Sequence, residues 1–174
     1  MLFQERGIAR SAQAFAVAAA VSVASLSALA PLPAAAEAGP FAALGGVWTG
    51  GGTISLENGT KERLRCRVQY VITNEGNNLQ QSLNCDSVTY HFHVNAYVNY
   101  KGGVLSGNWT ETTRNATGRI SGKASGGKIF VSVAAGKAFS AKMSMVTTGN
   151  SQSVTIKPTG TDVTDISVTV NKAR

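Results

Sequence analysis

The sequence lacks the short motifs that mark the common classes of enzyme. It has no Gly-x-Ser-x-Gly nucleophile elbow and no glycine-rich phosphate loop. Its only two cysteines are expected to pair with each other, which leaves no thiol to act as a nucleophile. No pair of carboxylates has a spacing that argues for acid–base chemistry. We therefore predict that the protein is not an enzyme and needs no cofactor.

Helical periodicity is also missing, and proline is scarce, with four residues in 174. After residue 37 no apolar stretch repeats with helical spacing over three turns. What recurs is a short run of alternating apolar and polar residues, then Gly, Asn or Ser, then another alternating run. This rhythm is typical of antiparallel strands joined in chain order, so it predicts an all-β fold.

Long apolar runs are absent except at the start of the chain. Arg6 and Arg10 precede an uncharged run over residues 14–30, and the small residues 34–36 fit a cleavage site. The run is short for a membrane anchor. We expect export by the general secretory route to the periplasm or beyond. The predicted parts are a cleaved signal peptide, a short lead and a β-barrel domain, at residues 1–36, 37–45 and 46–174.

The two cysteines fix the pairing of one hairpin. A turn at residues 74–77 places residue i opposite residue 151 − i, so that Cys66 faces Cys85. Directly opposed residues on antiparallel strands lie close enough for a disulfide. We predict this disulfide and expect it to contribute about 3 kcal/mol, as the closure of a loop of roughly 20 residues does in the chain-entropy model.

Turn residues predict the register of the other hairpins, because a slip of one residue would send every side chain to the wrong face. In the first hairpin we expect Ile54 opposite Leu64 and Gly52 opposite Cys66. Further pairs are Tyr100–Leu105, Ala96–Trp109, Ala124–Ile129, Ile120–Val133, Val133–Phe139, Met145–Val154 and Met143–Ile156. Pro158 should end its strand or lie where no ladder donor is needed.

The apolar positions change from odd to even numbers after Cys85. We interpret the change as a bulge or bend at Asp86–Ser87 within one long strand, of the kind that lets a sheet curl. Strands in strict meander order, each with one apolar face, predict a single up-and-down antiparallel barrel of about 8–10 strands. A sandwich would need long crossing connections that are not present.

Two sequences, Gly46-Val47-Trp48-Thr49-Gly50 and Gly107-Asn108-Trp109-Thr110-Glu111, carry a family resemblance. A Gly-x-Trp that opens a small meander barrel resembles the calycin group of lipocalins and avidins. The resemblance implies that Trp48 packs across the barrel floor against a late Arg, although no Arg precedes Arg174 in the last strands. The chain from residue 37 is also similar to small exported alphaproteobacterial proteins of uncharacterised function. This similarity implies no mechanism.

Four inward positions are candidates for contact with a small apolar ligand: Trp48, Tyr90, Trp109 and Glu111. A carboxylate that points into the barrel must form an ion pair or hydrogen bonds, be protonated, or lie at an end of the barrel that is open to water. Glu111 therefore either orients a ligand or is bonded to a nearby Lys, Arg or backbone amide at the barrel end.

Basic residues predominate after the predicted cleavage site, with 14 Lys and Arg against 8 Asp and Glu. Arg63, Arg65 and Arg67 alternate onto one outer face, where guanidinium groups can bind phosphate or carboxylate in a bidentate manner. The alternative is a charged face that only keeps the strand soluble and prevents wrong pairing. Nucleic acid is not expected as a partner, since the basic residues are spread along an exported chain.

His91 and His93 project side by side, as two ligands of a metal site would. No third ligand is evident in the sequence, and two histidines on a solvated face are usually only polar surface. We therefore predict no metal.

Two hypotheses for function follow. The first is a non-catalytic periplasmic or secreted barrel that binds a small apolar ligand inside or an anionic component of the cell envelope outside. The second is a structural or protein-interaction factor of the envelope, such as an inhibitor or assembly factor. Insertion as an outer-membrane barrel is not expected, because the outward positions are Arg, Lys, Thr, Ser and Asn rather than an apolar band.

Overall fold

The computed structural model describes residues 38–174, and the predicted signal peptide lies outside the described residues. Two short 3-10 helices are η1 (Ala42–Leu44) and η2 (Asn74–Gly76). Ten strands make up nearly all the rest: β1 (Gly46–Leu56), β2 (Lys61–Thr73), β3 (Asn78–Asp86), β4 (His91–Lys101), β5 (Val104–Glu111), β6 (Ala116–Ser125), β7 (Lys128–Ala135), β8 (Phe139–Thr148), β9 (Ser151–Thr159) and β10 (Val163–Lys172).

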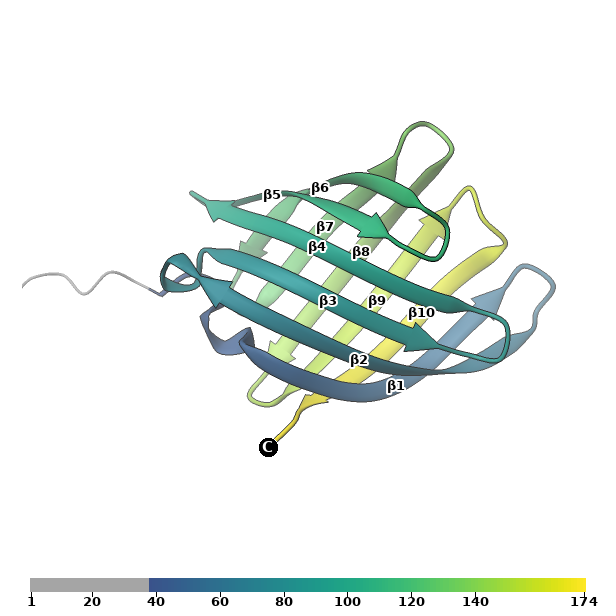
Figure 1. Ribbon diagram of the computed structural model, residues 1–174, viewed down its shortest axis with the longest axis horizontal. Coiled ribbons are helices and arrows are strands. Elements are labelled where there is room, and N and C mark those ends of the chain that lie inside the picture. The colour runs from purple at the N-terminus through teal and green to yellow at the C-terminus, as the bar shows by residue number, and fades with distance from the viewer. Residues whose placement is uncertain (1–37) are drawn as a thin grey trace, which may run out of the picture. The chain divides into compact units, whose positions relative to one another are not determined.

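Each strand pairs antiparallel with the next strand in the chain, and β1 also pairs with β10, which closes the sheet into a barrel. Figure 1 shows β2 to β4 crossing in front of β7 to β9. This confirms the predicted all-β up-and-down barrel and sets the number of strands at ten. A closed barrel leaves no sheet edge unpaired.

The barrel has two ends, which differ in their covering. One end carries η1, η2 and the short turns after β4, β6 and β8, and we call it the η1 end. The opposite end, called the distal end, carries the loops at 57–60, 87–90, 112–115, 136–138 and 160–162. Within residues 38–174, no helix is both long and apolar enough to cross a membrane.

Alternation of side chains along each strand separates the core from the surface. In β2, for example, Leu64, Cys66, Val68 and Tyr70 are buried, while the residues between them are exposed. The period of two residues places every second side chain inside the barrel. Inward positions are even in β1, β2, β4, β6, β9 and most of β10, and odd in β3, β5, β7 and β8.

The predicted disulfide is present between two buried residues. Cys66 and Cys85 are register partners in β2 and β3, and their Cα atoms lie 4.1 Å apart. Three other hairpins also have the predicted register, at the turns after β4, β6 and β8: Tyr100–Leu105, Ala96–Trp109, Ala124–Ile129, Ile120–Val133, Met145–Val154 and Met143–Ile156. Gly and Asn in these turns therefore predicted the pairing correctly.

Two predicted registers are wrong by two residues. Gly52 pairs with Leu64 and Gly50 with Cys66, in place of the expected Gly52–Cys66 and Ile54–Leu64 pairs. The first turn is centred one residue earlier than expected, because Gly59, with φ +84°, lies after its centre. A shift of two residues keeps each side chain on its face, which is why apolar matching did not detect it.

The second wrong register is in the hairpin between β7 and β8. Val133 pairs with Ala141, and Phe139 pairs with Ala135. The turn is centred one residue later than expected, at Lys137, since Gly136 opens the loop with φ +59°. Pro158 pairs with Ala141 one residue before the end of β9.

The predicted bend at Asp86–Ser87 is a turn between two separate strands. The backbone N–H of Ser87 donates to the carbonyl of Tyr90 at 2.8 Å, and Asp86 pairs with His91 across the turn. Because the loop holds four residues, odd positions of β3 face even positions of β4. The change of parity therefore signals a tight hairpin, and the prediction of one long bent strand is wrong.

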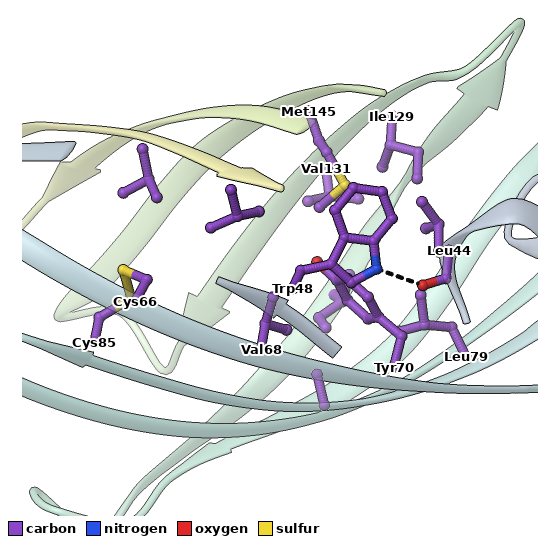
Figure 2. Packing of buried hydrophobic residues seen from close by; sticks show 14 of the residues in the cluster. Leu44, Trp48, Cys66, Val68, Tyr70, Leu79, Cys85, Ile129, Val131 and Met145 are labelled. Atoms are coloured by element: carbon purple, nitrogen blue, oxygen red, sulfur yellow. Dashed lines mark hydrogen bonds between the residues drawn. A yellow bond between two sulfur atoms is a disulfide. The ribbon is translucent and has the colours of Figure 1, made fainter. Parts of the chain in front are cut away.

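Trp48 lies at the centre of the core near the η1 end. Figure 2 shows its ring between Met145 and Val131 on one side and Leu44 and Tyr70 on the other. All of these side chains are buried, and Trp48 itself is 0% exposed. The indole thus spans from wall to wall, and Phe41 and Leu44 cover this end of the barrel.

Glycines in β1 allow an unusually close approach of neighbouring backbones. A Cβ on Gly50 would lie 2.1 Å from the carbonyl oxygen of Thr169, and one on Gly52 would lie 1.8 Å from that of Ser167. No side chain fits at such distances. These glycines let β1 coil tightly against β10 where the barrel closes.

Candidate functional site

The four residues predicted to contact an inner ligand do not form one site. Trp48 lies at the η1 end, whereas Tyr90 and Glu111 lie at the distal end. Trp109 packs edge-on against Phe139, with ring centroids 5.9 Å apart. The environment of each residue shows which of its polar groups are already bonded.

The polar group of Trp48 is occupied by the protein itself. Its Nε1–H donates to the carbonyl oxygen of Leu44 at 2.7 Å. The Nζ of Lys172 lies 5.7 Å from the centroid of the indole and donates to the carbonyl oxygen of Ala43 at 3.0 Å. A late lysine thus stands where the calycin resemblance implies a late arginine.

A second buried polar contact crosses the interior. The hydroxyl of Tyr70 donates to Oε1 of Gln152 at 2.9 Å, and Nε2 of Gln152 donates to Oγ1 of Thr147 at 3.1 Å. Burial raises the pKa of Tyr70, only partly offset by the bond to Gln152, so the phenol stays neutral. This pair was not predicted from the sequence, because a single Gln at an inward position is the only sign of a buried hydrogen bond there.

Glu111 is buried, and its carboxylate is fully engaged at the distal end. Oε1 accepts hydrogen bonds from the backbone N–H of His93 at 3.1 Å and of Thr113 at 3.0 Å, and from the Thr113 hydroxyl at 2.5 Å. Oε2 accepts from the backbone N–H of Arg114 at 2.7 Å. Burial by itself raises the pKa of Glu111, but these bonds outweigh it and hold the pKa below its ordinary value.

Aromatic rings and charges are stacked next to this carboxylate. Tyr90 and Phe92 lie parallel with centroids 5.9 Å apart, and the guanidinium of Arg114 lies 5.2 Å from the centroid of Phe92. The Tyr90 hydroxyl donates a short hydrogen bond to Asp162, which raises the pKa of Tyr90 and lowers that of Asp162. The stack ties three loops together at the distal end.

One more carboxylate ties down the loop after β3. Glu62 Oε2 accepts from the hydroxyl of Ser87 at 2.6 Å and from the backbone N–H of Thr89 at 2.9 Å. The bond from Ser87 is the largest cause of the lowered pKa of Glu62. Glu62, Glu111 and Asp162 are therefore bonded within the chain and hold the distal loops in place.

Arg63, Arg65 and Arg67 lie on the outer wall, as predicted from their alternation. All three are exposed, and none forms an ion pair or a side-chain hydrogen bond within residues 38–174. Their register partners on β1 are Thr53, Gly51 and Thr49, which leave the row uncovered on that side.

His91 and His93 also lie on the outer wall. Nδ1 of His91 lies 2.8 Å from Oδ1 of Asp86, its register partner, and His93 is paired with Asn84. No cluster of three or more His, Cys, Asp or Glu suited to a metal occurs within residues 38–174.

Two hollows lie on the outer wall. One, of about 580 Å³, opens over β5 to β7, with Trp109 and Gly118 beneath a rim that includes Asn108 and Arg119. The indole N–H of Trp109 is buried and has no hydrogen-bond partner within the described chain. A Cβ on Gly118 would lie 2.5 Å from that nitrogen, so the glycine makes room for the ring.

The second hollow, of about 290 Å³, opens over β6 to β9. Val131 and Met143 form part of its floor, and Lys142 and Lys157 stand on its rim with Phe130. Most of the residues that line either hollow are at outward positions. These two hollows therefore belong to the surface of the barrel and not to its interior.

A charge pattern in the part of the chain that forms the second hollow was not predicted. Between Glu111 and Asp162 the chain contains no Asp or Glu, while seven Lys and Arg occur: Arg114, Arg119, Lys123, Lys128, Lys137, Lys142 and Lys157. A count of charged residues in successive segments of the chain would have found this stretch, whereas the total charge of the chain does not reveal it.

Comparisons with known proteins inform the fold alone. No family model matches the chain, and no curated protein matches it in sequence. A similar solved structure is the crystal structure of Rv2717c from M. tuberculosis, with a TM-score of 0.57 and 15% identity. The match covers 76% of this chain and 94% of that chain. The two proteins share a fold at this level of identity.

Proposed function

We propose that this protein is an exported, non-catalytic barrel that binds an anionic component of the cell envelope on its outer wall. The observation that carries the proposal is the sorting of charge between the wall and the ends. Ten outward strand positions hold exposed Lys or Arg: Lys61, Arg63, Arg65, Arg67, Lys101, Arg119, Lys123, Lys128, Lys142 and Lys157. Two outward strand positions hold Asp: Asp86 and Asp165.

The ten cations lie on six of the ten strands, and the other acidic groups lie in loops or at inward positions. Glu62, Glu111 and Asp162 hold their negative charge at the distal end, where they are bonded within the chain. A surface of one sign attracts ligands of opposite sign and raises their rate of association. Phosphate and carboxylate groups are the ligands that guanidinium groups bind best.

An inner apolar ligand has less support. Trp48 fills the space between the walls near the η1 end, and its N–H is bonded to Leu44. Both hollows described above open outward. The disulfide supports the exported location, since such bonds persist in oxidising compartments.

Binding of purified lipopolysaccharide at low salt tests the proposal. The variant Arg63→Gln/Arg65→Gln/Arg67→Gln should bind about tenfold more weakly, which corresponds to about 1.4 kcal/mol. A control that removes two positive charges outside the strands, Lys137→Gln/Arg174→Gln, should bind nearly as the wild type does. Equal loss in both variants would mean that only net charge matters. Absence of salt-sensitive binding by the wild type would refute the proposal.

A further inference from the structure

The strands β6 to β9 present a second basic surface, three to five strands away from the arginine row on β2 in a ring of ten. We propose that this surface docks the protein on a bilayer of anionic phospholipids. We call it the lysine–phenylalanine face, and it consists of Lys123, Lys128, Phe130, Lys142 and Lys157. The inference rests on the proposed function and names the partner of a different part of the same wall.

Two lysines of this face are held against each other by the register. Lys142 of β8 and Lys157 of β9 are direct partners, and both are exposed. Like charges directly opposite on neighbouring strands destabilise a sheet. A phosphate between the two ammonium groups would remove that repulsion. A bound anion would therefore stabilise this arrangement.

The hollow between these lysines suits a phosphate headgroup. Its rim includes the hydroxyls of Ser132 and Ser144, and Ser132 is the register partner of Lys142. Hydroxyl groups donate to phosphate oxygens beside the charged donors. The hollow has a volume of about 290 Å³ and opens to solvent on the outer wall.

Exposed apolar side chains accompany the lysines. Phe130 is 54% exposed and lies between Lys123 of β6 and Ser144 of β8 in the register. Val146, which is 38% exposed, is the register partner of Lys128. Within residues 38–174, Phe130 takes part in no aromatic or cation–π pair.

A bilayer surface satisfies both kinds of group at once. Lysines contact the phosphates of anionic headgroups, while an aromatic ring reaches the boundary between headgroups and acyl chains. A soluble anion would leave Phe130 and Val146 in water. From residue 112 to residue 161 the chain contains no acidic residue, so nothing on these strands repels an anionic surface.

The test is co-sedimentation with vesicles of phosphatidylglycerol mixed into phosphatidylcholine, compared with pure phosphatidylcholine. We expect the wild type to bind only the anionic vesicles. Each lysine near the surface contributes about fivefold, so Lys142→Gln/Lys157→Gln should weaken binding about 25-fold. Phe130→Ser should weaken it about tenfold.

Matched controls separate this inference from the proposed function. Tyr97→Ser removes an exposed aromatic of similar exposure, 58%, from β4 and should leave vesicle binding unchanged. The triple arginine variant should lose lipopolysaccharide binding but keep most of its vesicle binding. The opposite pattern, with vesicle binding lost in the arginine variant and kept in the lysine variant, would overturn the inference alone.

Two further results would also overturn the inference. One is binding of the Phe130→Ser variant with wild-type affinity, which would mean that charge alone suffices. The other is complete release from vesicles by millimolar inorganic phosphate at constant ionic strength, which would indicate a site for free phosphate. Thermal unfolding of every variant checks that these exposed substitutions leave the barrel folded.

Discussion

Replacement of Glu111 by glutamine distinguishes a structural carboxylate from one that is available to a ligand. The substitution keeps the shape of the side chain, but one oxygen becomes an NH2 group. If that group replaces Oε2, it faces the backbone N–H of Arg114, which now donates to Oε2 at 2.7 Å. If the amide is flipped, the NH2 group faces the N–H groups of His93 and Thr113. Either orientation sets donor against donor.

The expected cost of this substitution is about 2 to 4 kcal/mol of the free energy of unfolding at pH 7. One buried donor loses its acceptor, and the remaining bonds lose the charge that strengthens them. Urea denaturation followed by circular dichroism measures the difference. Glu57→Gln is the control, because Glu57 is exposed in a distal loop and should change stability by less than about 0.5 kcal/mol.

Acid should remove the difference between the wild type and Glu111→Gln. Because the pKa of Glu111 is lowered in the folded state, its charged form stabilises the protein above the ordinary pKa of 4.5. That stabilisation is lost as the pH falls through the folded-state pKa. The two denaturation midpoints should therefore converge progressively as the pH falls below 4.5. A Gln variant as stable as the wild type at pH 7, or a gap that stays constant in acid, would refute this reasoning.

Three shorter predictions concern the barrel itself. Reduction of the disulfide should lower the free energy of unfolding by about 3 kcal/mol in urea, without unfolding the protein in buffer. Gly52→Ala should cost about 3 kcal/mol in the same assay, because its Cβ would meet the carbonyl of Ser167; an unchanged midpoint would contradict the close packing of β1 and β10. Trp48→Phe should cost about 2 kcal/mol, through the lost bond to Leu44 and the unfilled volume, with a lower melting temperature as the readout.

The sequence predicted the barrel because alternation and turn residues are local signals. Cys66 and Cys85 added a check that does not depend on hydrophobicity, and their pairing is confirmed. The register was predicted wrongly where two alternative turn centres leave every side chain on the same face of the sheet. A shift from Gly52–Cys66 to Gly50–Cys66 changes no side-chain direction, so only the backbone preferences of Asn58 and Gly59 could decide it.

The distal end was harder to predict than the strands. Tyr90, Phe92, Arg114 and Asp162 meet there although they come from distant parts of the chain. No sequence period relates residues 90 and 162, since their contact depends on the closure of the barrel. Glu111 was singled out correctly as an inward carboxylate, but its bonds to three backbone N–H groups required the conformation of the following loop.

The packing of the inward side chains explains why we place the proposed binding on the wall. Inward positions are constrained by packing, because a changed volume there costs stability. The distal end is constrained as well, since its carboxylates fasten loops to the strands. Outward strand positions are free of both constraints, and neutral Thr, Ser and Asn would keep them soluble. Instead, these positions hold ten cations against two Asp, and directly opposed lysines occur where a neutral residue would be more stable. The proposed anionic partner would account for that excess, whereas solubility alone does not favour repulsion within a sheet.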